Sequence, residues 1–126
     1  MIYLTVEDGL AIAARAGLTV GDPGLLASAM ARPQASAFGE DAYPTLALKA
    51  AALIDSINRN HPLVDGNKRL SWLCAVVFMR LNGFDIAADP DDAEQLIVAV
   101  AVGRAELPAI STWIEDHTGT FQGDPP

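Results

Sequence analysis

The stretch His61-Pro-Leu-Val-Asp-Gly-Asn-Lys-Arg69, followed directly by an apolar run over residues 70–81, decides the fold of this chain. A residue before proline is pushed out of the α region, so a helix arriving from upstream should end by Asn60. Asp65-Gly66 is typical of a turn. From Asn67 onward the pattern is apolar nearly all round, which predicts a helix buried in the middle of a helical bundle.

The first turn of that predicted helix breaks a rule of helix electrostatics. Lys68 and Arg69 lie where the helix dipole favours anions rather than cations. The free N–H groups of a helix start, together with Gly66, the Asn67 side chain and the two cations, would form a phosphate-binding site. The sequence therefore predicts that something negatively charged binds here.

Two further polar residues lie just upstream. His61 can accept a proton, and Asp65 can bind a hard metal ion. A purely structural interpretation stays open, with Asp65 as a helix N-cap, His61 as a C-terminal cation on the preceding helix, and Lys68 and Arg69 simply solvated. That interpretation leaves the position of the two cations unexplained, so we favour the phosphate site.

The run HPLVDGNKR resembles the signature of the Fic/Doc superfamily, H-x-F-x-[D/E]-[G/A]-N-[G/K]-R. Lys68, at the [G/K] position, is similar to the death-on-curing (Doc) branch, the toxins of Phd–Doc-type toxin–antitoxin pairs. The likeness extends through residues 25–34 and 78–83 and covers most of the chain. Two positions depart from the pattern: Leu63 stands where Phe is usual, and Trp72 stands where AMP-transferring members carry a second Arg.

The resemblance implies an all-α fold, a compact helical bundle around a central buried helix, with a short β-hairpin flap beside the active site. It implies catalytic roles for His61, Lys68 and Arg69, binding of ATP by Gly66, Asn67, Lys68 and Arg69, and binding of Mg²⁺ by Asp65. In AMP-transferring relatives a Gly at the Lys68 position leaves room for the terminal phosphates. Lys68 crowds that space, so the resemblance implies a reversed nucleotide with its γ-phosphate at the loop.

The function expected from this resemblance is Mg-ATP-dependent phosphorylation of a Ser or Thr hydroxyl on a protein. It implies elongation factor Tu as the target, arrest of translation as the result, and a Phd-like antitoxin as the partner. No Glu is followed by Gly or Asn, so the [S/T]-x-x-x-E-[G/N] inhibitory pattern of many Fic enzymes is missing, and inhibition must come from another chain. Two alternatives stay open: transfer of AMP or another nucleotide, and a non-catalytic binding module.

Length and composition define the class of protein. With 126 residues, 51% of them hydrophobic, the chain is expected to form one domain with its own core. A net charge of −8 argues against direct binding of nucleic acid. No signal peptide is visible and no apolar run approaches the ~18 residues of a membrane span, so we expect a cytoplasmic protein. The resemblance to the Doc branch implies a bacterial one. Cys74 is the only cysteine and is expected to be a buried thiol.

The other elements follow from apolar periodicity and from capping residues. We expect helices over about residues 5–16, 23–31, 44–59, 67–81, 90–103 and 108–117, with a connector at 84–88. Residues 32–42 are the candidate flap, with a plain surface loop as the alternative. His117 lies on the apolar stripe of the last helix and is interpreted as structural. The Fic/Doc domain is expected to span residues 1–118, followed by a disordered tail over 119–126.

Overall fold

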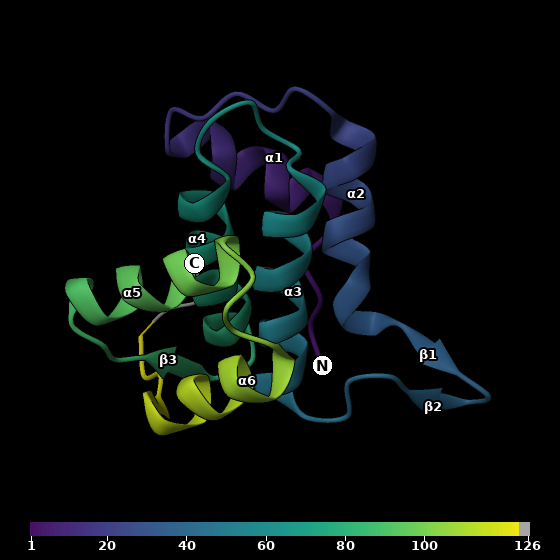
Figure 1. Ribbon diagram of the computed structural model, residues 1–126. Coiled ribbons are helices and arrows are strands. Elements are labelled where there is room, and N and C mark those ends of the chain that lie inside the picture. The colour runs from purple at the N-terminus through teal and green to yellow at the C-terminus, as the bar shows by residue number, and fades with distance from the viewer. Residues whose placement is uncertain (124–126) are drawn as a thin grey trace.

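The computed structural model describes residues 1–123, which form six α-helices, one short 3₁₀ helix and two small antiparallel sheets (Figure 1). The helices are α1 (Val6–Arg15), α2 (Pro23–Ala31), α3 (Leu46–Asn60), α4 (Asn67–Leu81), α5 (Pro90–Ala101) and α6 (Leu107–Asp116), with η1 at Arg32–Gln34. The strands are β1 (Ser36–Ala37), β2 (Glu40–Asp41), β3 (Phe84–Ile86) and β4 (Thr118–Thr120). The predicted all-α class with a short hairpin is confirmed.

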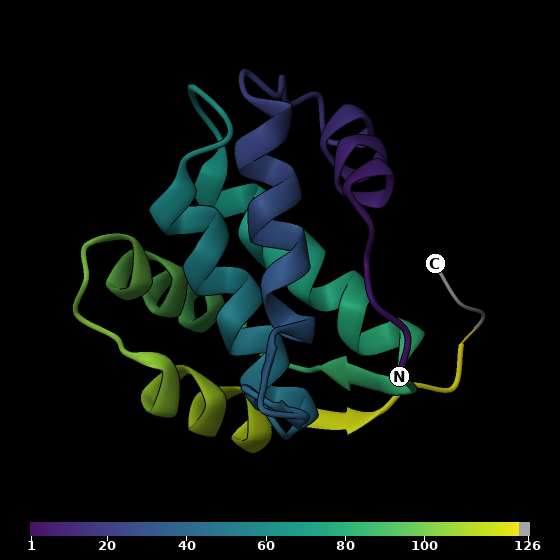
Figure 2. The same ribbon diagram turned by 90° about the vertical axis from the view of Figure 1, so that its right-hand side faces the viewer.

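The most buried helix is α3, which packs against α2, α4, α5 and α6. Figures 1 and 2 show it between α2 on one side and α5 and α6 on the other. Ten of its fifteen residues are buried, against seven of fifteen in α4. The sequence predicted the helix over residues 67–81 as the central one, and this is corrected: α4 packs closely on α3 but is less enclosed. Four buried alanines explain why, since small side chains let several neighbours approach α3.

Side-chain caps begin the first three helices. Thr5 and Asp8 form a capping box at α1, with the Thr5 N–H donating to the Asp8 carboxylate at 2.8 Å. Asp22 caps α2, whose first residue is proline. Thr45 caps α3, so this helix begins at Leu46 rather than at the expected residue 44.

Residues 32–42 form the predicted β-hairpin, but not in the predicted place. Strands β1 and β2 pair antiparallel around Phe38-Gly39, both in the left-handed region with φ of 54° and 82°. The hairpin precedes the start of α3, whereas the His61 loop follows its end, and 15 helical residues span roughly 22 Å. Figures 1 and 2 both show the hairpin and the loop at opposite ends of α3. The expectation of a flap beside the loop is therefore wrong.

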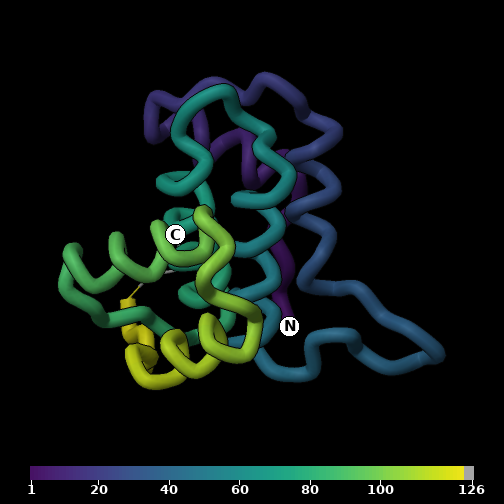
Figure 3. Tube along the Cα trace, in the orientation of Figure 1, coloured from purple at the N-terminus to yellow at the C-terminus, as the bar shows by residue number. Residues whose placement is uncertain are grey.

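The C-terminal segment closes the fold with a second small sheet. The expected connector contains β3, which pairs antiparallel with β4, and the Phe121 N–H donates to the Gly83 carbonyl at 3.0 Å. Residues 119 and 120 are thus in a strand rather than in the disordered tail expected over 119–126, and residues 124–126 lie outside the described part of the chain. Figure 3 traces this return of the chain toward β3.

None of the helices within residues 1–123 has both the length and the apolar character needed to cross a bilayer.

Candidate functional site

The backbone of the His61 loop is held in an unusual conformation at both ends. Helix α3 ends at Asn60, as predicted, and His61 follows in the left-handed region with φ 50° and ψ 58°. Gly66, with φ 98°, is the N-cap residue of α4. A non-glycine residue in this region costs of order 1–3 kcal/mol and is retained where the surrounding structure enforces it, often at functional sites.

Contacts with residues 20–22, distant in the sequence, hold the loop in this conformation. The Pro62 carbonyl accepts hydrogen bonds from the N–H groups of Gly21 and Asp22, both at 3.0 Å. Val20 and Leu63 form an isolated antiparallel bridge. Leu63, which stands where the family pattern has Phe, is only 2% exposed, so the apolar anchor at this position is kept.

Asn67 fastens the loop to α4 through its side-chain amide. Its Oδ1 accepts from the Leu63 N–H at 3.0 Å, and its Nδ2 donates to the Leu63 carbonyl at 2.7 Å. The same Nδ2 lies 3.1 Å from Nδ1 of His61. Asn67 is buried, at 6% exposure. The sequence predicted the Asn67 side chain as part of the phosphate site, whereas in the structure this amide binds the backbone of the loop.

This arrangement has a consequence for the imidazole of His61. Because Oδ1 of Asn67 faces the Leu63 N–H, its Nδ2 must face His61 as a donor. Nδ1 of His61 therefore accepts, and the proton of the neutral ring is on Nε2. The His61 side chain is exposed, so this nitrogen faces solvent at the mouth of the loop.

The start of α4 is open to an anion. No side chain caps it in the part of the chain that the structure describes; α5 and α6 also lack side-chain caps, but only α4 has two cations in its first turn. The first bond along this helix runs from the Leu70 N–H to the Gly66 carbonyl at 2.9 Å. The N–H groups of residues 67–69 precede it and point out of the helix end. Asp65 is exposed and does not cap the helix, so the structural interpretation of that residue fails.

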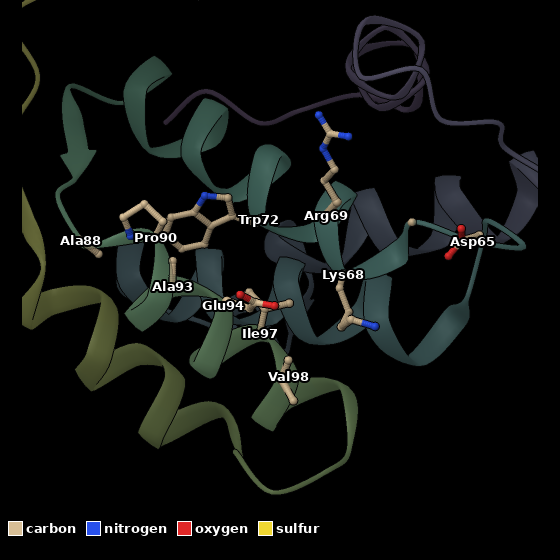
Figure 4. Close-up of a pocket in the computed structure, with 11 residues that line it drawn as sticks. Asp65, Lys68, Arg69, Trp72, Ala88, Pro90, Ala93, Glu94, Ile97 and Val98 are labelled. Carbon is tan, nitrogen blue, oxygen red and sulfur yellow. The ribbon is translucent and has the colours of Figure 1, made fainter.

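The two cations of this first turn do not converge. Lys68 and Arg69 are both exposed, and neither belongs to the four ion pairs formed within residues 1–123. Figure 4 shows Arg69 extending toward α1 and Lys68 extending to the other side of α4. One cation thus extends to each side of the helix start, whereas the sequence suggested that both would point to a single anion site.

Two hollows flank α4; Arg69 lines both of them, and Lys68 lines only the first. The first, called here the α4/α5 pocket, has a volume of about 520 Å³ and is shown in Figure 4. Its walls are Asp65, Gly66, Lys68, Arg69 and Trp72 from the loop and α4, and Ala88, Pro90, Ala93, Glu94, Ile97 and Val98 from α5 and the residues before it. Four predicted site residues line it, whereas His61 and Asn67 do not.

The second hollow, the α1/α4 groove, has a volume of about 570 Å³ and an apolar floor. Leu73, Val77 and Leu81 form its α4 side, and Arg69 lies among its lining residues. These side chains account for part of the excess of apolar residues in α4, since Leu73, Val77 and Leu81 are not fully buried and line the groove. The α5 wall of the pocket and the α1 wall of the groove were missed in the sequence, because no motif marks them.

The other candidate side chains are structural. His117 stacks on Trp113 with ring centroids 3.9 Å apart, and its Nδ1 lies 2.7 Å from the Trp113 carbonyl, as expected for a structural role. Cys74 is fully buried, and burial raises the pKa of its thiol to about 12. It is the inert core thiol that the sequence predicted.

Comparison of the sequence with known proteins identifies the same family as the signature in the His61 loop. The model of the Fic/DOC family matches residues 3–79, which include α1, α2, α3, the His61 loop and most of α4. A protein of Mycolicibacterium smegmatis named Toxin Doc is 50% identical over 125 residues, covering 95% of this chain and 96% of that relative. Both matches contain the loop between α3 and α4 that carries the signature. The chain belongs to the Fic/DOC family.

Proposed function

We propose that this chain is a Doc-type toxin of a toxin–antitoxin pair, and that it transfers the γ-phosphoryl group of Mg-ATP to a Ser or Thr hydroxyl of a protein. The observation that carries this proposal is the uncapped start of α4, with Lys68 and Arg69 in its first turn and His61 fastened beside it by Asn67. The 50% identity to a protein named Toxin Doc supports the toxin part of the proposal.

The proposed reaction is a single displacement at phosphorus. The target hydroxyl oxygen forms a bond to the γ-phosphorus, and the bond from that phosphorus to the oxygen shared with the β-phosphate breaks, so that ADP leaves. His61 takes the hydroxyl proton on Nε2. Lys68, Arg69 and the N–H groups of the helix start hold the phosphoryl oxygens.

His61 must change tautomer before it can act as this base. With Nδ1 accepting from Asn67, the neutral ring carries its proton on Nε2 and cannot accept another there. A half turn of the exposed ring about its Cβ–Cγ bond moves Nδ1 away from Asn67; Nδ1 then takes a proton from solvent and Nε2 releases its own proton to solvent, which frees the Nε2 lone pair. This torsion is soft in histidine, so the half turn needs no change in the backbone.

Asp65 is the residue that would hold Mg²⁺. Within residues 1–123 there is no cluster of three or more His, Cys, Asp or Glu side chains suited to a metal. Mg²⁺ in phosphoryl-transfer sites usually binds to one or two carboxylates and to the phosphates themselves, so an exposed aspartate beside the anion site fits this ion. When bound, the ion would neutralise charge on the phosphates.

The antitoxin would act from outside this chain, because the sequence lacks the built-in inhibitory pattern. The α1/α4 groove is a suitable place for an amphipathic helix of a Phd-like antitoxin, since Leu73 and Val77 offer an apolar floor. Arg69 lines this groove and also begins the catalytic helix. A bound antitoxin helix would therefore cover a cation needed for phosphate binding.

The test uses the purified chain with elongation factor Tu and ATP labelled at either the γ or the α position. We expect the target to retain the γ label, and His61→Ala to abolish both labelling and growth arrest in cells. Arg69→Ala should lower labelling strongly, whereas Arg80→Ala, which removes a cation from the last turn of α4 at the other end of that helix, should leave it unchanged.

Two outcomes would contradict the proposal, and a third would change its target. Retention of the α label would assign the chain to nucleotide transfer. Growth arrest that persists in His61→Ala would indicate a non-catalytic binding module. Labelling of another protein from a cell lysate, with elongation factor Tu unlabelled, would replace the target and leave the reaction in place.

A further inference from the structure

The α4/α5 pocket continues away from the phosphate site along one face of α4. Lys68 and Trp72 both line it, and they are four residues apart, so they lie one above the other on the helix. Four residues correspond to roughly 6 Å along the helix axis. The interior beyond Lys68 is apolar, formed by Trp72 together with Ala88, Pro90, Ala93, Ile97 and Val98. A charged mouth thus leads into an apolar interior.

Trp72 is positioned as a rigid wall of this pocket. Its indole is half buried and lies edge to face with Trp113, with ring centroids 6.0 Å apart. Trp113 is stacked in turn on His117 at 3.9 Å. These rings of α6 brace the indole from behind, and Figure 4 shows it beside Pro90 and Ala93 at the end of the pocket remote from Asp65. An immobilised aromatic ring suits a flat ligand group.

We propose that this pocket takes the base of the nucleotide whose phosphates bind at the start of α4, with Trp72 as the aromatic surface against which the base packs. The inference rests on the proposed function, because it assumes that the phosphates bind beside Lys68. Glu94, exposed at the edge of the pocket, can accept a hydrogen bond from an exocyclic amino group such as that of adenine. Trp72 is then a specificity-determining residue, and its place at the usual position of a second Arg is explained.

The size of the effect follows from the stacking of bases on aromatic side chains. Truncation of such an aromatic residue weakens binding by about 5- to 150-fold, which corresponds to roughly 1–3 kcal/mol. This loss of affinity comes only from contacts with the base. The affinity for inorganic tripolyphosphate, which has the phosphates of ATP but no base, should stay unchanged.

The experiment measures the binding of ATP and of tripolyphosphate by calorimetry, with the full chain and Mg²⁺ present. In Trp72→Ala the ATP affinity should fall by about 5- to 150-fold, whereas Trp72→Phe should keep most of it. Val98→Trp fills the pocket from α5, where Val98 is 41% exposed, without removing a core side chain, and should weaken ATP binding in the same way. The matched control is Leu73→Ala, a truncation at the neighbouring position, which faces the α1/α4 groove and should leave both affinities unchanged.

The possible failures can be told apart. If ATP binds the unsubstituted chain no better than tripolyphosphate, or if Trp72→Ala and Val98→Trp leave ATP binding intact, the base subsite is wrong while the phosphate site stands. If ATP binding depends on Trp72 but the α label is transferred, the kinase proposal is wrong and the base subsite stands. If neither ligand binds, both proposals are overturned. A further outcome is that an apolar peptide binds the chain without displacing either ligand. If Val98→Trp abolishes this peptide binding, the pocket is a protein-docking site instead.

Discussion

Replacing Asn67 with alanine is expected to lower the free energy of unfolding by roughly 2–5 kcal/mol. The change removes both hydrogen bonds to the backbone of Leu63, a residue only 2% exposed. Each buried backbone group left without a partner costs about 1–3 kcal/mol, so the two together cost roughly 2–6 kcal/mol. Alanine returns about 0.6 kcal/mol at most through its higher helix propensity. The loss is large against a typical total stability of roughly 5–15 kcal/mol.

The assay is urea unfolding followed by circular dichroism, with the midpoint and the slope fitted together. Asn60→Ala is the matched control. The Asn60 side chain makes one hydrogen bond, to the Leu25 carbonyl at 3.2 Å, and this bond is exposed to solvent. We expect this control to lose less than about 1 kcal/mol. If the two variants lose the same amount, Asn67 does not hold the loop and the reasoning fails.

The same variant tests the tautomer of His61. In the unsubstituted chain the ¹⁵N shifts of the imidazole should report a proton on Nε2, because Nδ1 accepts from Asn67. In Asn67→Ala this preference should be lost. A ring that carries its proton on Nδ1 before the substitution would show that the amide does not face the histidine as described.

Three further predictions concern the loop, the core thiol and the hairpin. His61→Gly should be more stable than His61→Ala by about 1 kcal/mol in urea unfolding, because both lose the bond to Asn67 and only glycine is unstrained at φ 50°. Cys74 should not react with a thiol reagent at pH 8 until the chain unfolds. Since burial raises the pKa of this thiol from 9.0 to about 12, the folded state binds the proton more tightly, and stability present below pH 9 should be lost as the pH rises toward 12. The Lys49 ammonium, 3.2 Å from Asp41 and only 2% exposed, anchors β2, so Lys49→Met should increase hydrogen exchange in the hairpin while costing less stability than Lys49→Ala.

Arg69 connects the two hollows that flank α4. Its backbone belongs to the first turn of α4, and its side chain extends toward α1. Under the proposed function, a ligand in the α1/α4 groove would compete with phosphate for the same guanidinium. We propose that an antitoxin bound there would inhibit in this way, without a change in the fold.

The sequence by itself determined the helices, their caps and the identity of the site loop. Each of these depends on residues close together in the chain. Thr5 and Asp8 form their capping box across three positions, and the turn at Gly66 and the end of α3 before Pro62 follow from backbone sterics. The nine-residue signature likewise places His61 at the start of one short loop and Lys68 in the helical turn that follows it, whatever the rest of the chain does.

Only the tertiary structure decided which helix is the most buried, where the hairpin lies and what surrounds the loop. Periodicity reports how apolar a helix is, but not how many neighbours cover it, so α4 was taken as central although α3 is more enclosed. The hairpin is distant from the loop because a helix of 15 residues separates them. The role of Asn67 depends on a turn that brings Leu63 within hydrogen-bond distance, and the pocket wall opposite Trp72 comes from residues that follow it by 16 to 26 positions. Such contacts depend on how the helices pack, and no local pattern encodes that packing.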